Sequence, residues 1–387
     1  MTETFLHGVE TIQVASETGS VSTVKTAVIG LLGDSQTGDV NKLKLCTSAT
    51  DDNHFGLMSA ESISPLRMAL YSIRLQHPTA VVFAINFSQG DQYDDDDITG
   101  AVSTEKIGAR LFETCKSTYG FNPKIFIAGI DGAVSANDCL RDLAEKYRGV
   151  AYLDGSNSYA TTITSRGTSG EWNFSDYRTK LLYPFVIMEG QNQSLGMSAI
   201  AAGLRAKIDV EEGFWVSSSN HTYKKIKSVT ESLSWELNDP TCEANKLNEL
   251  GITTIVNVYG SGFREWGNRN SAFPTKTDVR TFEAMQRLDD ITSESIELAS
   301  LPYIDRPMTK AQIDFVTETV NGYFNTLIAK GALQPGSRCV FDASKNTAAE
   351  MANGHYVWTK EFMGAVPGER FTFYSVIDTS LLSTLTA

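Results

Sequence analysis

The sequence lacks the features that mark secreted, membrane-spanning and zinc-binding chains. Its five cysteines are scattered, odd in number and never form a C-x-x-C pair, which fits thiols in a reducing compartment better than a disulfide framework. No apolar run approaches the roughly 18 residues that a membrane helix needs. The first residues show no basic stretch followed by an apolar one, so they do not resemble a signal peptide. We therefore expect no membrane insertion.

The chain is also short of positive charge. Its formal net charge is −13 over 387 residues. Nucleic-acid binding needs clustered Lys and Arg to neutralise phosphates, and base stacking needs aromatic residues among them. Neither pattern is present, so we expect no nucleic-acid partner. The acidic balance keeps the chain soluble and suits a basic partner surface.

Ligand-binding motifs are equally scarce. The five histidines are widely spaced and follow no metal-ligand pattern. Gly33–Asp39 follows a predicted strand as a phosphate loop would, but Asp39 and Val40 stand where such a loop needs Lys and a hydroxyl. Asp94–Asp97 lacks the alternating ligands of a calcium loop and predicts a solvated loop. We predict neither a cofactor nor a metal site.

One serine deserves comparison with a hydrolase nucleophile. Ser198 lies in G-M-S-A before a predicted helix, a slight resemblance to the nucleophile segment of subtilisin-like proteases, and Asp34 slightly resembles their aspartate segment. A histidine between them would have to take the serine proton. His54 and His77 are the candidates, and neither stands in the histidine-glycine-threonine helix start of that family. We predict no catalytic residue.

Alternating strands and helices fill the first two thirds of the chain. Six apolar runs predict strands buried on both faces, as in a parallel sheet: Lys25–Gly33, Ala80–Phe87, Lys124–Ile130, Gly149–Asp154, Leu181–Met188 and Ile252–Val258. Helical candidates lie between them: Pro65–Arg74, Thr104–Tyr119, Asn137–Arg148 and Met197–Ala206. This alternation predicts a layered α/β domain over residues 21–260.

Two helices are predicted beyond that domain, over residues 278–300 and from Thr309 to Lys330. Thr309 and Gln312 have the spacing of a capping box, and Gly331 suits the left-handed residue that ends a helix. The second helix has a single apolar stripe, Ile313, Val316, Val320, Tyr323, Phe324 and Leu327. Gly322 in its middle implies either a close approach by another backbone or a tolerated weakness.

Strand-like segments stand at both ends of the chain. Phe5–Val14 predicts a short strand, followed by the Ser/Thr/Gly-rich connector Ser16–Ser22. Ser337–Asp342 and Tyr356–Glu361 predict strands, and Phe371–Ile377 predicts a last strand of high β-propensity. The two outermost strands need a partner in this chain or in another one, because a lone strand leaves its backbone groups unpaired.

A series of short segments, in order, resembles one known family. The segments are F-L-H-G-V-E (Phe5–Glu10), V-I-G-L-L-G (Val28–Gly33), F-N-P-K-I-F-I-A (Phe121–Ala128), L-Y-P-F-V (Leu182–Val186), A-G-L-R-A (Ala202–Ala206), G-F-W-V-S-S-S-N (Gly213–Asn220), E-A-N-K-L-N-E-L-G-I-T-T-I (Glu243–Ile255), W-G-N-R (Trp266–Arg269) and D-R-P-M-T (Asp305–Thr309). Together they resemble the contractile tail sheath proteins of phages, of R-type pyocins and of related injection machines.

The resemblance implies a subtilisin-like layered α/β region without protease activity, an α+β C-terminal sheath domain and strand-like arms at both termini. The implied divisions are residues 1–20, 21–260, 261–365 and 366–387. Arms of the family add strands to neighbouring subunits, which assigns that role to two sets of residues: Phe5, Leu6, Val9, Ile12 and Val14, and Phe371, Phe373, Val376 and Ile377. Candidates facing the inner tube are Arg306, Thr309, Lys310, Asn321 and Lys330.

By the same resemblance, the chain would be a structural subunit of a virion tail, assembled in the host cytoplasm. Copies would stack as hexameric rings around an inner tube and contract to drive that tube through the target envelope. Implied partners are further copies of the chain, the inner tube protein, and baseplate and tail terminator proteins. The alternatives are an active hydrolase of subtilisin-like fold and a baseplate-type adaptor that shares the sheath fold without polymerising.

Overall fold

The structure is a computed structural model that describes residues 21–59, 63–90, 93–100, 105–129, 134–156, 158–167 and 170–385. Contacts divide the chain into two compact units. The described part of unit 1 is residues 21–24 and Ile291–Gly364, and unit 2 is Lys25–Asp290 with the chain from Ala365 onward. The division differs from the predicted boundary at 260/261, which falls inside the hairpin between two paired strands of unit 2.

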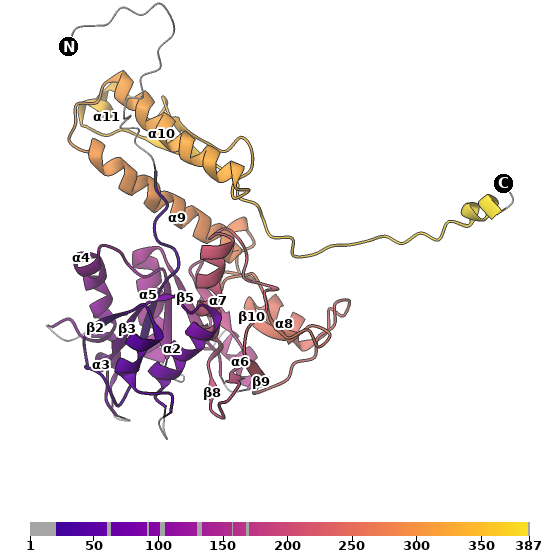
Figure 1. The fold of residues 1–387 in the computed structure, drawn as a ribbon. Coiled ribbons are helices and arrows are strands. Elements are labelled where there is room, and N and C mark those ends of the chain that lie inside the picture. The colour runs from indigo at the N-terminus through magenta and orange to yellow at the C-terminus, as the bar shows by residue number, and fades with distance from the viewer. Residues whose placement is uncertain are drawn as a thin grey trace, which may run out of the picture. The chain divides into compact units, whose positions relative to one another are not determined.

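Unit 2 is built on an eight-stranded, mostly parallel sheet. Several of its strands are labelled in Figure 1. Its strands are β1 (Val28–Gly33), β2 (Leu43–Cys46), β3 (Val81–Asn86), β4 (Ile125–Gly129), β5 (Val150–Asp154), β6 (Thr179–Leu182), β10 (Ile252–Asn257) and β11 (Phe263–Trp266). The spatial order is β11-β10-β6-β5-β4-β1-β3-β2. The inner pairs are parallel, and the edge strands β2 and β11 run antiparallel to their neighbours. The prediction of a layered α/β region is confirmed, whereas the subtilisin-like detail stays a prediction.

Helices cover both faces of this sheet, as the central strands β1, β3 and β4 require, since they are apolar on both sides. On β1, Ile29 and Leu31 join the core beneath α2 (Pro65–Gln76) and α7 (Met197–Glu211), while Val28 and Leu32 join the opposite core beneath α5 (Val134–Tyr147). Helices α2 and α7 pack closely. A Cβ on Gly203 would lie 2.8 Å from the carbonyl oxygen of Ile73, so only glycine fits there.

The remaining helices of unit 2 are short. They are α1 (Ala49–Asp52), η1 (Asn53–Phe55), α3 (Asp95–Thr99), η2 (Gly108–Thr114), α4 (Cys115–Tyr119), α6 (Tyr159–Ser165), α8 (Glu243–Glu249) and η3 (Val279–Thr281). The single helix predicted over Thr104–Tyr119 is therefore wrong, because Gly108 takes a left-handed φ of 51° and the chain continues as η2 and α4. The solvated loop at Asp94–Asp97 is also corrected. Asp94 caps α3, and Asp97 completes its capping box.

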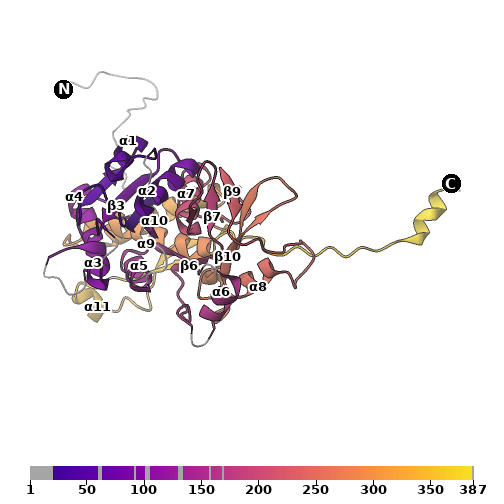
Figure 2. The same cartoon turned by 90° about the horizontal axis from the view of Figure 1, so that it is seen from below.

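The strand predicted over Leu181–Met188 is two strands in two sheets. β6 ends at Leu182, and β7 (Val186–Met188) belongs to a three-stranded sheet with β8 (Ser194–Leu195) and β9 (Ile226–Val229). Figure 2 labels β7 and β9, and Figure 1 labels β8. Pro184 lies between the two halves and has no N–H to donate to a ladder. The apolar pattern runs through this break, so the pattern alone could not locate it.

Unit 1 contains most of α9 (Glu283–Ser300), followed by η4 (Leu301–Tyr303), α10 (Lys310–Ala329), α11 (Ala348–Ala352) and a two-stranded antiparallel sheet of β12 (Arg338–Phe341) and β13 (Trp358–Glu361). The second long helix is confirmed nearly to the residue. Thr309 caps α10 by accepting from the Gln312 N–H, and Gly331 follows with φ 77°. Nothing lies near a Cβ built on Gly322, so of the two readings the tolerated weakness holds.

The C-terminal segment differs from its prediction. Phe371–Ile377 forms no strand, and Figures 1 and 2 draw it as an extended trace that leads to η5 (Thr379–Leu385). The high β-propensity of these residues cannot produce a strand without a neighbouring strand to supply hydrogen bonds. The N-terminal strand prediction at Phe5–Val14 lies outside the described residues.

Candidate functional site

The position of a hydrolase nucleophile is occupied by a self-contained hydrogen-bonded pair. Ser198, at the first turn of α7, lies close to Asp154 at the carboxyl end of β5. The Ser198 hydroxyl and its N–H (2.7 Å) both donate to the Asp154 carboxylate. The small cavity beside them, lined by Gly129, Gly196 and Leu195 among others, has a volume of about 20 Å³. Such a space accommodates one water molecule rather than a substrate.

No described histidine activates Ser198. His54 accepts a hydrogen bond from the Asp39 N–H at 3.3 Å, whereas the Ser198 hydroxyl donates to Asp154. His77 follows α2 and precedes β3, so it lies at the amino edge of the parallel strands, opposite the edge that carries Asp154. Of the other two described histidines, His221 contacts Glu212, and His355 contacts Glu350. A hydroxyl that donates to a carboxylate without an imidazole is not an activated nucleophile.

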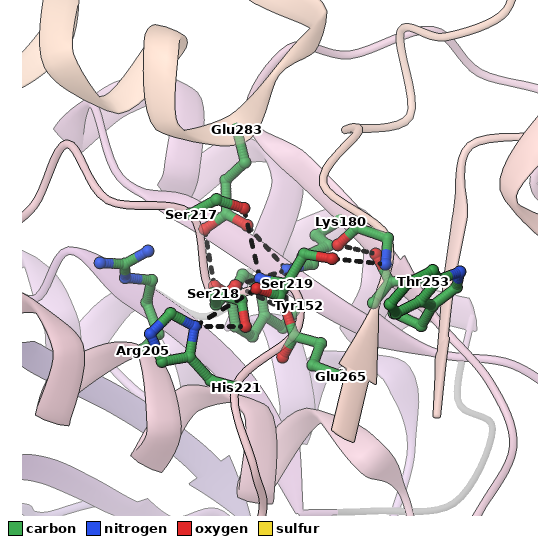
Figure 3. Close-up of polar contacts among 12 residues, drawn as sticks. Tyr152, Lys180, Arg205, Ser217, Ser218, Ser219, His221, Thr253, Glu265 and Glu283 are labelled. Atoms are coloured by element: carbon green, nitrogen blue, oxygen red, sulfur yellow. Dashed lines mark hydrogen bonds and ion pairs between the residues drawn. The ribbon is translucent and has the colours of Figure 1, made fainter. Parts of the chain in front are cut away.

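The most concentrated polar chemistry in unit 2 is a buried ionic cluster, shown in Figure 3. The Lys180 ammonium, from β6, lies 2.5 Å from Glu265 Oε1 and 2.9 Å from Glu283 Oε2. Tyr152 donates to Glu283 Oε1 at 2.7 Å. Ser218 accepts from Lys180 at 3.0 Å. All five side chains are essentially inaccessible to solvent, so each charge meets an opposite charge in a medium of low dielectric.

The charges of this cluster hold one another in their ionised forms. Burial by itself disfavours the Lys180 ammonium, but the carboxylates of Glu265 and Glu283 outweigh it and raise the pKa of Lys180. Burial also opposes ionisation of Glu283, yet Lys180, Arg205 and Arg287 lower the pKa of Glu283 to about 2. Burial and the neighbouring carboxylates raise the pKa of Tyr152 well above its usual range, so this phenol remains a donor.

A second set of ion pairs, buried or partly buried, holds the first two turns of α9 within unit 2. Arg205 and Asp209, both from α7, pair at 2.7 Å, and Asp209 also binds Arg287 of α9. Arg178 binds Asp290 through two parallel bonds of 2.9 and 2.6 Å. Together with Glu283, these contacts attach one side of α9 to β6 and α7. The arrangement is structural, because its donors and acceptors are directed at each other rather than at a cavity.

Sequence reasoning missed this cluster. One signal was present, since Lys180 stands inside the apolar run T-K-L-L-Y-P-F-V, where a charge is out of place unless it is paired. Glu265 lies next to the W-G-N-R segment that carried part of the family resemblance. Their meeting depends on β6 and β11 flanking β10, which the residue pattern does not state.

The five candidates for contact with a tube divide into two groups. Arg306, Thr309, Lys310 and Lys330 are exposed. Asn321 is half-buried, and its amide binds the backbone of β12: Nδ2 donates to the Cys339 carbonyl at 2.9 Å, and Oδ1 accepts from the Cys339 N–H at 2.7 Å. Its observed contact is therefore structural.

The described arm candidates are almost completely exposed. Phe371, Phe373, Val376 and Ile377 have exposed fractions of 76%, 89%, 84% and 92%. Single chains seldom expose this many large apolar side chains in one short segment, unless the segment binds something else. The other arm candidates, Phe5, Leu6, Val9, Ile12 and Val14, lie outside the described residues.

Among the described residues, no three side chains of His, Cys, Asp or Glu gather in a way that could hold a metal ion. Within the same part of the chain, no helix has the length and apolar character to cross a membrane.

Sequence comparisons match tail sheath proteins along the whole chain. Residues 100–271 match the family model described as the phage tail sheath protein central domain. The tail sheath protein of Burkholderia phage BcepMu is 31% identical, with 100% of this chain and 99% of that protein covered. The tail sheath protein of Escherichia phage P2 is 24% identical over 98% of this chain and 97% of that protein.

Solved structures of the same fold come from contractile machines. The sheath of an extracellular contractile injection system, PVC, in its contracted state has a TM-score of 0.74 at 17% identity, covering 98% of this chain and all of that one. The contracted helical sheath of the anti-feeding prophage has a TM-score of 0.73 at 18% identity, covering 97% and 100%.

Proposed function

We propose, from the premise that this chain belongs to the family of phage tail sheath proteins, that its copies stack as hexameric rings around an inner tube and contract to drive the tube through a target envelope. The chain is a structural subunit of a contractile tail sheath and not an enzyme, and its place is the tail of the virion. The ring symmetry, the tube contacts and the course of contraction are the proposed part.

The observation that carries this proposal is the exposed C-terminal segment. Residues 371–377 alternate along an extended backbone, so Phe371, Phe373 and Ile377 share one side, and Tyr374 and Val376 share the other. A strand of this composition gains hydrogen bonds and apolar contacts only by joining another sheet. A second copy of the chain is the occupant we assign to it, because the family relatives are sheath proteins.

The sheet of unit 1 is a suitable acceptor for a strand donated by another copy of the chain. Within the described residues it consists of β12 and β13, and two strands alone are marginally stable in water. Asn321 already occupies the outer side of β12 at Cys339. Strands received from other copies would complete this sheet and keep subunits joined while their bodies move.

Contraction requires two packings of one subunit that differ in free energy. Strand exchange supplies the constant connection, and the connectors predicted from the sequence at residues 16–22 and 364–369 are the proposed points of rotation. The exposed side chains Arg306, Thr309, Lys310 and Lys330 remain the proposed contacts with the tube protein. Baseplate and tail terminator proteins are the proposed partners at the two ends of the sheath.

The proposal is tested first by negative-stain electron microscopy of the purified chain over a concentration series. We expect hollow striated tubes from the full chain and dispersed, folded particles from variants that lack residues 1–15 or residues 371–387. A matched pair sharpens the test: Phe373→Ser with Ile377→Ser should prevent tubes, whereas Thr372→Ser should not.

Normal tubes from either truncated chain would contradict the arm assignment. Dispersed particles from the full chain, even after addition of the cognate tube protein, would favour the adaptor of the same fold over the polymerising sheath.

A further inference from the structure

Arg269, the last residue of W-G-N-R, is held more tightly than a surface arginine needs to be. Its Nη1 donates to Thr281 Oγ1 at 2.6 Å, and its guanidinium lies 3.6 Å from the centre of the Phe282 ring. The Thr281 hydroxyl is fully buried and donates in turn to the Asp278 carbonyl, so its lone pair is fixed toward Arg269. These contacts hold the guanidinium from two sides in addition to the carboxylate described next.

The remaining edge of this guanidinium receives a carboxylate from far along the chain. Arg269 Nε donates to Glu369 Oε1 at 3.0 Å, and Nη2 donates to Glu369 Oε2 at 2.6 Å. Two parallel bonds of this kind fix orientation as well as distance, which a lysine cannot do. The side chain of Arg269 is only 17% exposed, so the carboxylate also supplies the countercharge that a half-buried cation requires.

Glu369 stands at the point where the C-terminal segment leaves the folded chain. It follows Pro367 and Gly368, and every residue from Arg370 to Leu382 is exposed. Both partners of the pair belong to unit 2. We propose that Arg269, Thr281 and Phe282 form a carboxylate-binding site whose ligand is Glu369, and that this clamp fixes the root of the C-terminal segment.

The clamp has a consequence for strand donation, a step that rests on the proposed function. Clamping residue 369 shortens the freely moving chain and restricts the directions that residues 371–377 can take. Restricting a segment before it binds lowers the entropy lost on binding. The clamp therefore favours capture of the segment by a neighbouring copy.

The site itself is tested on the dispersed full chain by limited digestion with chymotrypsin. Cleavage after Phe371 requires residues 368–370 to enter the protease active site, and so requires the clamp to open. Cleavage after Tyr374 leaves the clamp in place. The rate of cleavage after Phe371 divided by the rate after Tyr374 therefore measures how often the clamp opens. We expect Glu369→Gln and Arg269→Lys each to raise this ratio by about fivefold, the effect of losing a partly exposed ion pair. Glu189→Gln, which removes the comparable exposed pair with Lys225 outside the proposed acceptor sheet, is the control and should leave the ratio unchanged.

An unchanged cleavage ratio in both variants would overturn the clamp.

The role of the clamp in assembly is measured separately, as the protein concentration at which tubes form. We expect Glu369→Gln to raise that concentration by about fivefold relative to Glu189→Gln.

A higher cleavage ratio with no change in that concentration would overturn the role in strand donation and leave the site standing. A chain that forms no tubes under any condition would contradict the proposed sheath function, and the digestion would still decide on the clamp.

Discussion

At the scale of single residues, the buried charges decide which substitutions unit 2 tolerates. Lys180, Glu265 and Glu283 are so deeply buried that the loss of one partner leaves another charge without compensation. The net contribution of such a pair to stability is small, because the cost of removing both charges from water offsets most of their attraction. Removing only one partner destabilises the fold much more, because it leaves the other charge buried and unpaired. Arg287 adds a further unfavourable contribution, because its Nε and Nη1 are buried without a hydrogen-bond partner among the described residues.

The pKa of Glu283 leads to a prediction about acid stability. Its pKa is about 2 in the folded chain and 4.5 in the unfolded reference, so its contribution is fully present above pH 4.5 and is lost as the pH falls toward 2. The contribution is on the order of 3 kcal/mol. We expect Glu283→Gln to lower the free energy of unfolding at neutral pH and to flatten its dependence on pH between 5 and 2.

Urea unfolding followed by tryptophan fluorescence measures this effect, because Trp172, Trp215, Trp235 and Trp266 lie in unit 2. The exposed carboxylate variant Glu361→Gln is the control. Parallel pH profiles for the wild type and Glu283→Gln would show that Glu283 does not titrate with a lowered pKa.

At the scale of elements, unit 1 depends on the contact between α10 and β12. The apolar stripe of α10 buries Val316, Val320, Tyr323, Phe324 and Leu327. The same helix supplies Asn321, whose amide satisfies both backbone groups of Cys339, and Thr317, which accepts from the Trp358 indole at 2.9 Å. One helix thus holds both strands of the sheet that we propose as acceptor.

Replacing Asn321 should loosen this sheet. Asn321→Ala removes two hydrogen bonds and leaves the Cys339 N–H and carbonyl unsatisfied, which costs about 1–3 kcal/mol. Asn325→Ala, at an exposed position one turn further along α10, is the matched control. Trp358, the fifth tryptophan and the one in unit 1, reports on the change if the other four are replaced by phenylalanine. Equal losses in the two variants would indicate that Asn321 acts only through helix propensity.

At the scale of the whole molecule, the net negative charge opposes the assembly of copies, whereas strand exchange favours it. Each copy carries a net charge of −13, so copies repel at long range. Assembly must overcome this repulsion through contacts such as those proposed for the C-terminal segment.

Salt should therefore promote tube formation. Raising the ionic strength from about 0.1 M to about 1 M shortens the screening length from about 10 Å to about 3 Å and weakens the repulsion between copies. We expect the concentration at which tubes form to fall, as measured by sedimentation. Sucrose at matched osmolality is the control. Dissolution of tubes by salt would mean instead that ion pairs between copies dominate their association.

The local residue pattern was sufficient to predict those strands and helices that have the same burial along their whole length. The run from Val28 to Gly33 is apolar on both sides, which favours a strand covered on two faces, and the spacing from Thr309 to Gly331 predicts a helix with its N-terminal cap, its apolar stripe and its terminating glycine. The family resemblance, carried by short segments in order, was confirmed by relatives that match the whole chain.

Tertiary structure alone decided the features that depend on distant partners. Lys180 is tolerated in β6 because Glu265 and Glu283 converge on it, and Arg269 has a defined role because Glu369 returns to it one hundred residues later. Phe371–Ile377 has the composition of a strand but does not form one. A strand needs a second strand for its backbone hydrogen bonds, and the sequence of one segment does not show whether a neighbouring strand is present.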